Sequence, residues 1–209
     1  MAYLMLNLAL TTYCSMACPD CVIDIPRWKN KQHYPWEYFE QAAQYLAGHF
    51  KCVTLAGGEP TLHPRFVEFA PKLRDLFRVE RLHLETNGWG FDRFTDVFRC
   101  FDKIACSQYK DDSFAGCPDN AGKIAAYKAR HGEKSNLVTG KTVFVPRNLR
   151  PGTKPCARLG ILAYFDSLLY PCCAEPGLPT KVGISLTSDW EQRLAQVKAP
   201  CADCFFALP

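Results

Sequence analysis

The sequence has no long hydrophobic run and no concentrated run of basic residues. Its apolar N-terminal stretch, residues 3–10, is too short to cross a membrane and lacks the positive flank of an export signal. The 25 basic and 21 acidic residues leave a net charge of only +4, so charge indicates neither a nucleic-acid surface nor a membrane surface. We therefore expect a cytoplasmic protein in which residues 3–10 form a buried strand.

Cysteine, in contrast, is abundant, with 12 among 209 residues. A disulfide framework is typical of small exported domains that lack a core, but 48% hydrophobic and 22% charged residues predict an ordinary packed core. Metal binding is therefore favoured. The cysteines gather at the two ends of the chain: Cys14, Cys18 and Cys21 at the front, and Cys156, Cys172, Cys173, Cys201 and Cys204 at the back. The isolated ones fit small buried apolar side chains, namely Cys52, Cys100, Cys106 and Cys117.

Between these two groups, short apolar runs alternate with segments of helical periodicity. The runs predict strands at 5–10, 51–57, 80–88, 102–109 and 141–146, and the periodic segments predict helices at 36–46, 66–76, 93–100 and 120–132. Asp119 is the expected N-cap of the last helix. This alternation predicts an α/β fold with a parallel sheet, which is either doubly wound or all or part of a barrel.

Thiol and polar residues follow the ends of these strands. They are the front cysteines, then Gly57-Gly58-Glu59-Pro60, then Thr86-Asn87-Gly88, and finally Ser107. In both possible folds, ligands bind at the carboxyl ends of the strands. We therefore expect these residues to meet on one rim.

The front cysteines have the spacing C-x3-C-x2-C. Three thiolates can hold three corners of a cubane iron-sulfur cluster and leave the fourth iron open, whereas a structural zinc site closes all four positions. The spacing therefore favours a reactive cluster. The alternative is a zinc site that a fourth cysteine from elsewhere completes.

The cysteine motif, together with Gly57-Gly58-Glu59-Pro60 after the second strand, resembles the radical S-adenosylmethionine (SAM) superfamily. The resemblance implies a partial (β/α) TIM-like barrel and a 4Fe-4S cluster on Cys14, Cys18 and Cys21. It also implies that SAM binds the open iron and is reductively cleaved to a 5'-deoxyadenosyl radical, which abstracts a substrate hydrogen. A low-potential electron donor such as flavodoxin or ferredoxin is the implied partner.

The resemblance assigns two further groups of residues to SAM. Gly57, Gly58, Glu59 and Pro60 match the motif that receives the methionine ammonium, and Thr86, Asn87 and Ser107 match positions that often bind the ribose or the carboxylate. The alternative for the second group is a role as turn and cap residues. The family usually has an aromatic residue near the adenine just before the third cysteine; this chain has Asp20 there, so no adenine contact is assigned.

The tail forms a second constellation. It predicts a hairpin around Asp166-Ser167, a helix that the capping box Ser188-Asp189-Trp190-Glu191 opens, and a closing Cys201-x2-Cys204. By itself this segment would also fit a zinc knuckle. With the front motif, it resembles a twitch domain, a short form of the SPASM domain, although Ser167 stands where glycine is usual.

The resemblance therefore divides the chain into a radical SAM domain, 1–150, and a twitch-like, cysteine-rich hairpin-plus-helix extension, 151–209. It implies an auxiliary 4Fe-4S cluster on Cys156, Cys172, Cys201 and Cys204, with Cys173 as a packing residue. Full cysteine ligation favours an electron-transfer or a structural role for this cluster, and an oxidation requires an exit for electrons.

The substrate class is argued from the short segment before Cys14, which leaves no room for a leader-binding domain. A small molecule is favoured, such as a sugar, aminocyclitol or nucleoside, with oxidation or epimerisation at a carbinol carbon. The alternatives are a peptide or protein substrate, a glycyl-radical activating enzyme, and a non-catalytic zinc or thiol-rich binding module. No catalytic residue is assigned, and the candidates for substrate contact are Tyr109, Asp111, Cys117 and Arg158.

Overall fold

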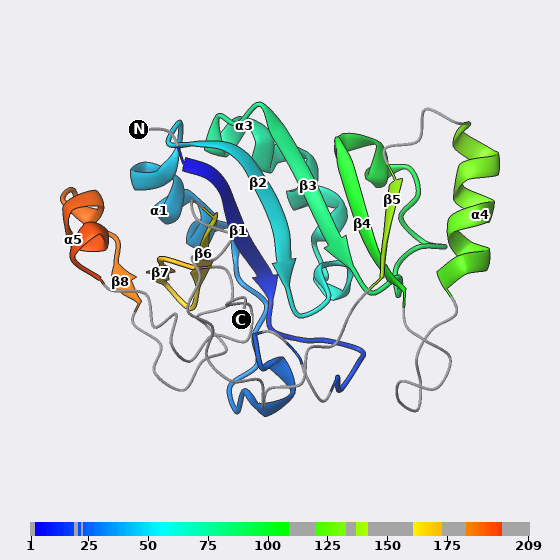
Figure 1. The fold of residues 1–209 in the computed structure, drawn as a ribbon, viewed down its shortest axis with the longest axis horizontal. Helices are drawn as coiled ribbons and strands as arrows, with labels where there is room; N and C mark the ends of the chain where they lie inside the picture. The colour runs from blue at the N-terminus through cyan, green and yellow to red at the C-terminus, as the bar shows by residue number, and fades with distance from the viewer. Residues whose placement is uncertain are drawn as a thin grey trace, which may run out of the picture.

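The computed structural model describes residues 3–18, 21, 23–108, 120–132, 137–141, 161–172 and 183–197. Its described strands form one sheet in the order β5-β4-β3-β2-β1-β6-β7-β8, which is open because β5 and β8 are its edges (Figure 1). The strands are β1 (Tyr3–Thr11), β2 (Phe50–Gly57), β3 (Arg81–Thr86), β4 (Lys103–Gln108), β5 (Leu137–Lys141), β6 (Ile161–Phe165), β7 (Leu168–Tyr170) and β8 (Ile184–Ser185). Strands β1 to β6 pair in parallel, whereas the pairs β6–β7 and β7–β8 are antiparallel, so the predicted α/β partial barrel is confirmed.

Strand β1 lies in the interior of the sheet. It pairs in parallel with β2 on one side and with β6 on the other. Leu6, Leu8, Ala9 and Leu10 have no exposed surface, as expected for a parallel strand covered on both faces. Because β6 pairs with β1, the hairpin predicted within the 151–209 unit extends the sheet of the 1–150 unit.

The helices are α1 (Trp36–Leu46), α2 (Phe66–Phe69), α3 (Leu73–Phe77), α4 (Asn120–His131) and α5 (Trp190–Gln196). In the described part of the chain, four 3-10 helices accompany them: η1 (Ile25–Arg27), η2 (Pro60–Leu62), η3 (Ala70–Lys72) and η4 (Val97–Cys100). Figure 1 shows α1 and α3 behind the sheet, α4 beside β5, and α5 beside β8. The helix expected at 36–46 is confirmed, and its side chains Phe39, Ala42 and Leu46 are fully buried.

Two predicted helices differ from the structure. The helix expected at 66–76 is divided into α2 and α3 by η3, because Pro71 has no N–H to continue the helical hydrogen bonds. The helix expected at 93–100 is reduced to the 3-10 helix Val97–Cys100, since Thr95 and Asp96 are weak helix formers.

Two smaller expectations are also corrected. Strand β5 begins at Leu137 rather than at Lys141, and residues 142–146 lie outside the described part of the chain. Helix α5 forms without the predicted capping box: Asp189 is its N-cap and makes no side-chain cap, because its Oδ1 accepts from Thr187 Oγ1 at 2.5 Å. The expected N-cap Asp119 of α4 lies outside the described residues.

The predicted hairpin at Asp166-Ser167 is confirmed. Strands β6 and β7 pair antiparallel on either side of these residues, whose φ angles are 49° and 62°. Two successive left-handed residues form the type I′ turn that matches the twist of a two-residue hairpin. No helix in the described ranges is long and apolar enough to span a membrane.

Candidate active site

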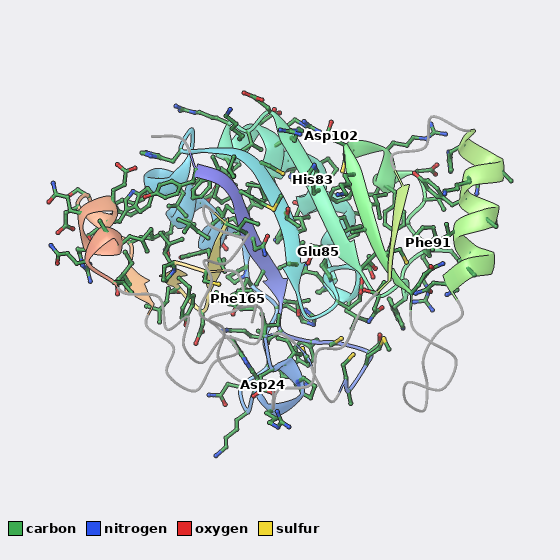
Figure 2. All side chains as sticks on the ribbon, in the orientation of Figure 1. Asp24, His83, Glu85, Phe91, Asp102 and Phe165 are labelled. Atoms are coloured by element: carbon green, nitrogen blue, oxygen red, sulfur yellow. The ribbon has the colours of Figure 1, made fainter. Side chains whose placement is uncertain are left out.

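The loop after β1 carries the three front cysteines. In Figure 1 this blue segment lies beyond the arrowheads of β1 and β2, at the carboxyl edge of the sheet. Cys14, Cys18 and Cys21 are all half-buried. The Cys21 N–H donates to the carbonyl of Cys18 at 3.3 Å, and the Asp24 N–H donates to the carbonyl of Cys21 at 3.0 Å. Figure 2 labels Asp24, which follows the cysteines, beyond this edge, and Asp102, which precedes β4, near the opposite edge.

The surroundings of the Cys14 thiol favour its protonated form. Burial raises its pKa, and the nearby Glu59 carboxylate and Cys21 add to the rise, whereas hydrogen bonds from the Met16 N–H and the Asn87 side chain oppose it. A bound metal ion would reverse this effect, because a coordinating thiol loses its proton. Metal binding at Cys14 would therefore release a proton.

The Gly57-Gly58 turn touches the cysteine loop directly. The Gly58 N–H donates to the carbonyl of Thr11 at 2.8 Å, and the Glu59 N–H donates to the carbonyl of Tyr13 at 2.7 Å. A Cβ atom on Gly58 would overlap the carbonyl oxygen of Tyr13, and Gly57 has a φ of 108°. Both glycines are therefore required by the close approach of the two loops.

Glu59 is completely buried beneath this turn, with 0% exposed surface. Its Oε1 accepts from the Thr61 N–H at 3.2 Å, from Thr61 Oγ1 at 2.5 Å and from Thr86 Oγ1 at 2.7 Å. Its Oε2 accepts from the Asn87 N–H at 2.7 Å. Burial raises the pKa of Glu59, and these donors oppose the rise. The carboxylate therefore joins the ends of β2 and β3.

Asn87 connects β3 to the cysteine loop. Its Nδ2 lies 3.1 Å from Ser15 Oγ and 3.6 Å from Cys14 Sγ, within hydrogen-bonding reach of both. Its Oδ1 accepts from the Trp89 N–H at 3.0 Å. The side chain is 7% exposed, so the amide is held at the rim rather than in solvent.

Asn120, the first residue of α4, is a site residue that sequence reasoning missed. Its Nδ2 donates to the carbonyls of Asn87 and Ser107, each at 2.7 Å. It therefore joins the carboxyl ends of β3 and β4. A polar residue opening a helix after a strand was the only sequence signal, and that signal fits an ordinary cap equally well. Ser15 was not predicted either, and its only signal in the sequence is that it directly follows Cys14.

The structure thus brings together several of the predicted residues. The Cys14 loop, Gly57, Gly58, Glu59, Pro60, Thr86, Asn87 and Ser107 all lie at the carboxyl edge of the sheet. Cys172 is half-buried just after β7. The remaining candidates lie outside the described residues: Asp20, Tyr109, Asp111, Cys117, Cys156, Arg158, Cys173, Cys201 and Cys204.

The donor set fits an iron-sulfur cluster. Three cysteine thiols come from one loop at the rim, and thiolate is the ligand that holds such clusters. Within the described ranges, no three His, Cys, Asp or Glu side chains converge closely enough for a single metal ion. A cubane is a larger body, and its cysteines bind separate irons rather than a common point.

An open, mostly parallel sheet with thiols at its carboxyl edge defines an α/β partial-barrel protein, and these thiols suit a metal cluster. Residues 8–106 match the sequence model described as the radical SAM superfamily. This stretch of the chain is therefore similar to the radical SAM superfamily.

Solved structures agree with this fold. The crystal structure of BtrN in complex with AdoMet and 2-DOIA has 15% identity and a TM-score of 0.64, covering 93% of this chain and 81% of BtrN. Streptococcus suis SuiB bound to S-adenosylmethionine has 13% identity and a TM-score of 0.51, with coverage of 88% and 63%. Methylornithine synthase (PylB) has 16% identity and a TM-score of 0.51, with coverage of 67% and 45%. No curated protein matches the chain.

Proposed function

We propose that the chain is a radical SAM enzyme that abstracts hydrogen from a small molecule, of the sugar, aminocyclitol or nucleoside type, to oxidise or epimerise it. The observation that carries the proposal is the direct contact of the cysteine loop with the Gly58 turn and Asn87 at one edge of the sheet. This edge is where ligands bind in parallel α/β folds. Three cysteines there suit a cluster that keeps one iron available.

Cys14, Cys18 and Cys21 would hold a 4Fe-4S cluster. When bound, the cluster supplies the electron for reductive cleavage of SAM. The main chain of the Gly57-Gly58 turn would receive the methionine ammonium, because the carboxylate of Glu59 is buried and already accepts four hydrogen bonds. Pro60, the first residue of η2, has no N–H, so it cannot donate a hydrogen bond to the carbonyls of the Gly57-Gly58 turn in place of the ammonium.

The polar residues at the ends of β3 and β4 differ in what they can offer to SAM. Thr86 is 3% exposed and its hydroxyl donates to Glu59, so it serves as a brace. Asn87 and the partly buried Ser107 lie nearer the surface of the rim and suit the ribose or the methionine carboxylate. The cysteine loop and these two residues would therefore border the ribose or the methionine carboxylate of the ligand.

The substrate class rests on the extent of the structural likeness. BtrN, which was crystallised with AdoMet and 2-DOIA, matches over 81% of its length, whereas SuiB, crystallised with the precursor peptide SuiA, matches over 64%. This supports a small-molecule substrate over a peptide. SuiB supports the second candidate, a radical SAM maturase that modifies a peptide, because its TM-score to this chain is 0.50.

An oxidation also needs a path for the electron that leaves the substrate. We assign this role to an auxiliary 4Fe-4S cluster in a twitch-like extension, held by Cys156, Cys172, Cys201 and Cys204. Cys172 is half-buried immediately after the β6–β7 hairpin, whose first strand pairs with β1. A flavodoxin or ferredoxin would supply electrons to the first cluster.

Anaerobic reconstitution tests this proposal. The wild-type protein should bind about eight irons as two cubanes and release 5'-deoxyadenosine from SAM and dithionite. Cys14→Ala should lose about half of the iron and all of the 5'-deoxyadenosine. The matched control is Cys52→Ala, since Cys52 is buried within β2 and should leave both unchanged. A colourless protein that binds zinc would instead indicate a non-catalytic module.

Candidate substrates then separate the two reaction classes. Sugars, aminocyclitols, nucleosides and peptides are incubated with the reconstituted enzyme, and mass loss of two hydrogens or inversion in deuterated solvent is recorded. Turnover of a peptide alone would overturn the small-molecule assignment and support the maturase.

A further inference from the structure

The Asn87 side chain has a fixed orientation toward the cysteine loop. Its Oδ1 accepts from the Trp89 N–H at 3.0 Å, which leaves Nδ2 facing Cys14 and Ser15. The amide could be reversed only by placing its NH2 group against the Trp89 N–H, where two donors would meet. The two hydrogens of Nδ2 therefore have one sulfur acceptor and one hydroxyl acceptor.

The main chain of Asn87 is held from both sides. Its N–H donates to Glu59 Oε2 at 2.7 Å, and its carbonyl accepts from Asn120 Nδ2 at 2.7 Å. Asn120 is 2% exposed, and its second donation, to the Ser107 carbonyl at 2.7 Å, anchors it to β4. Asn87 therefore has little freedom to withdraw its amide from Cys14.

We propose that Asn87, positioned by Asn120, donates a hydrogen bond to the Cys14 thiolate and thereby raises the reduction potential of the cluster that Cys14 would hold. This inference rests on the proposed function. Hydrogen bonds to cluster sulfurs and second-shell contacts adjust such potentials. The reduced cluster carries one more negative charge than the oxidised cluster, so a donor at the sulfur stabilises the reduced state more.

Titration of the reconstituted holoenzyme at a series of fixed potentials, monitored by electron paramagnetic resonance, tests this role. The signal that changes when SAM is added marks the cluster with the open iron. In Asn87→Ala, the ratio of reduced to oxidised cluster at a given potential should fall about tenfold. That ratio corresponds to a negative shift of about 59 mV for a one-electron couple.

Two further variants separate this role from a structural one. Ser15→Ala removes the other acceptor of Asn87 Nδ2 and leaves the contact with Cys14, so the ratio should stay at the wild-type value. Asn120→Ala loosens the Asn87 carbonyl and should lower the ratio by less than Asn87→Ala. Equal shifts in Ser15→Ala and Asn87→Ala would overturn the proposal, because general disturbance of the loop would then explain both.

A third variant tests the same hydrogen bond if Asn87→Ala does not retain its cluster. Asn87→Asp keeps the acceptor for the Trp89 N–H and replaces the donor by a carboxylate, so its ratio should fall by at least tenfold. An unchanged ratio in the iron-loaded Ala or Asp variant would overturn the proposal.

The proposed function can fail separately. If the wild type assembles no SAM-sensitive cluster, both proposals fail. If the wild type cleaves SAM and Asn87→Ala weakens only SAM binding, with the ratio unchanged, the potential-tuning role alone is wrong. Asn87 would then act only as the SAM contact that the proposed function already includes.

Discussion

The Thr86 hydroxyl donates a hydrogen bond of 2.7 Å to Glu59 Oε1, so the end of β3 is joined to the turn after β2 beneath the cysteine loop. The same carboxylate accepts from Thr61 and from the Asn87 N–H. The glutamate of the Gly-Gly-Glu-Pro motif is therefore a buried acceptor that holds the turn in a fixed position against the end of β3. The main chain of the turn, rather than the Glu59 side chain, remains able to face a ligand.

Glu59→Gln tests this role. The Gln NH2 group would replace a carboxylate oxygen that now accepts a hydrogen bond, so a buried donor would lose its acceptor. Leaving a buried donor unpaired costs about 1–3 kcal/mol. We expect the free energy of unfolding, measured by urea denaturation, to fall by about that amount. Thr61→Val, which removes a single hydroxyl donor and keeps the volume, should cost less.

The cost of Glu59→Gln should depend on pH. Burial raises the pKa of Glu59 above 4.5, so the folded state binds this proton more readily than the unfolded state. The resulting stabilisation is present below pH 4.5 and is lost as pH rises through the folded pKa. Gln has no such proton, so the difference between wild type and variant should grow as pH falls toward 4.5. A difference independent of pH would contradict the raised pKa.

Gly58→Ala tests the contact between the turn and the cysteine loop. The added Cβ would overlap the carbonyl of Tyr13, a backbone atom that cannot rotate away. We expect the cysteine loop to shift and iron binding after reconstitution to fall severalfold. Gly122→Ala is the matched control, because nothing lies within 4 Å of its Cβ position in α4. That variant should keep its iron and gain up to about 1 kcal/mol of stability. Full iron binding in Gly58→Ala would show that the two loops move independently.

The sequence could predict the residues of the rim because each follows an apolar run, and parallel strands bring their carboxyl ends to one edge. It could also predict the hairpin, since Asp and Ser tolerate the turn that Asp166 and Ser167 form. The role of Asn120 could not be predicted, because it depends on two carbonyls from different strands. Neither could the pairing of β6 with β1, which joins segments about 150 residues apart in the chain.

A chain ending at residue 150 tests whether the predicted domain boundary separates independent units. It would remove β6 and leave the edge of β1 unpaired, and exposed edges of apolar strands promote aggregation. We expect the shortened chain to be largely insoluble in a sedimentation assay.

Trp190→Ala in the full chain is the control for this truncation. Trp190 is 3% exposed, and its Nε1 donates to the carbonyl of Tyr45 at 3.2 Å, so the variant should lose about 3 kcal/mol of stability but stay soluble. A soluble shortened chain that unfolds cooperatively would show that the 1–150 unit is independent.

His63 should make the stability of the folded protein depend on pH. It is 4% exposed; its Nδ1 accepts from the Arg65 N–H at 3.1 Å, so its Nε2 carries the proton and donates to the carbonyl of Tyr34 at 2.9 Å. Burial lowers its pKa below 6.5, so the folded state holds the neutral ring. The stabilisation is present above pH 6.5 and is lost as pH falls through the lowered folded pKa.

His63→Gln should therefore lose about 1–2 kcal/mol of unfolding free energy above pH 6.5, because one of two buried hydrogen bonds is lost. Below pH 6.5 the gap between wild type and variant should narrow, since only the wild type must give up a proton to fold. Urea denaturation at several pH values measures both quantities. A gap that widens in acid would mean that the folded protein accommodates the charged imidazolium, and that the Arg65 N–H does not hold the ring in its neutral form.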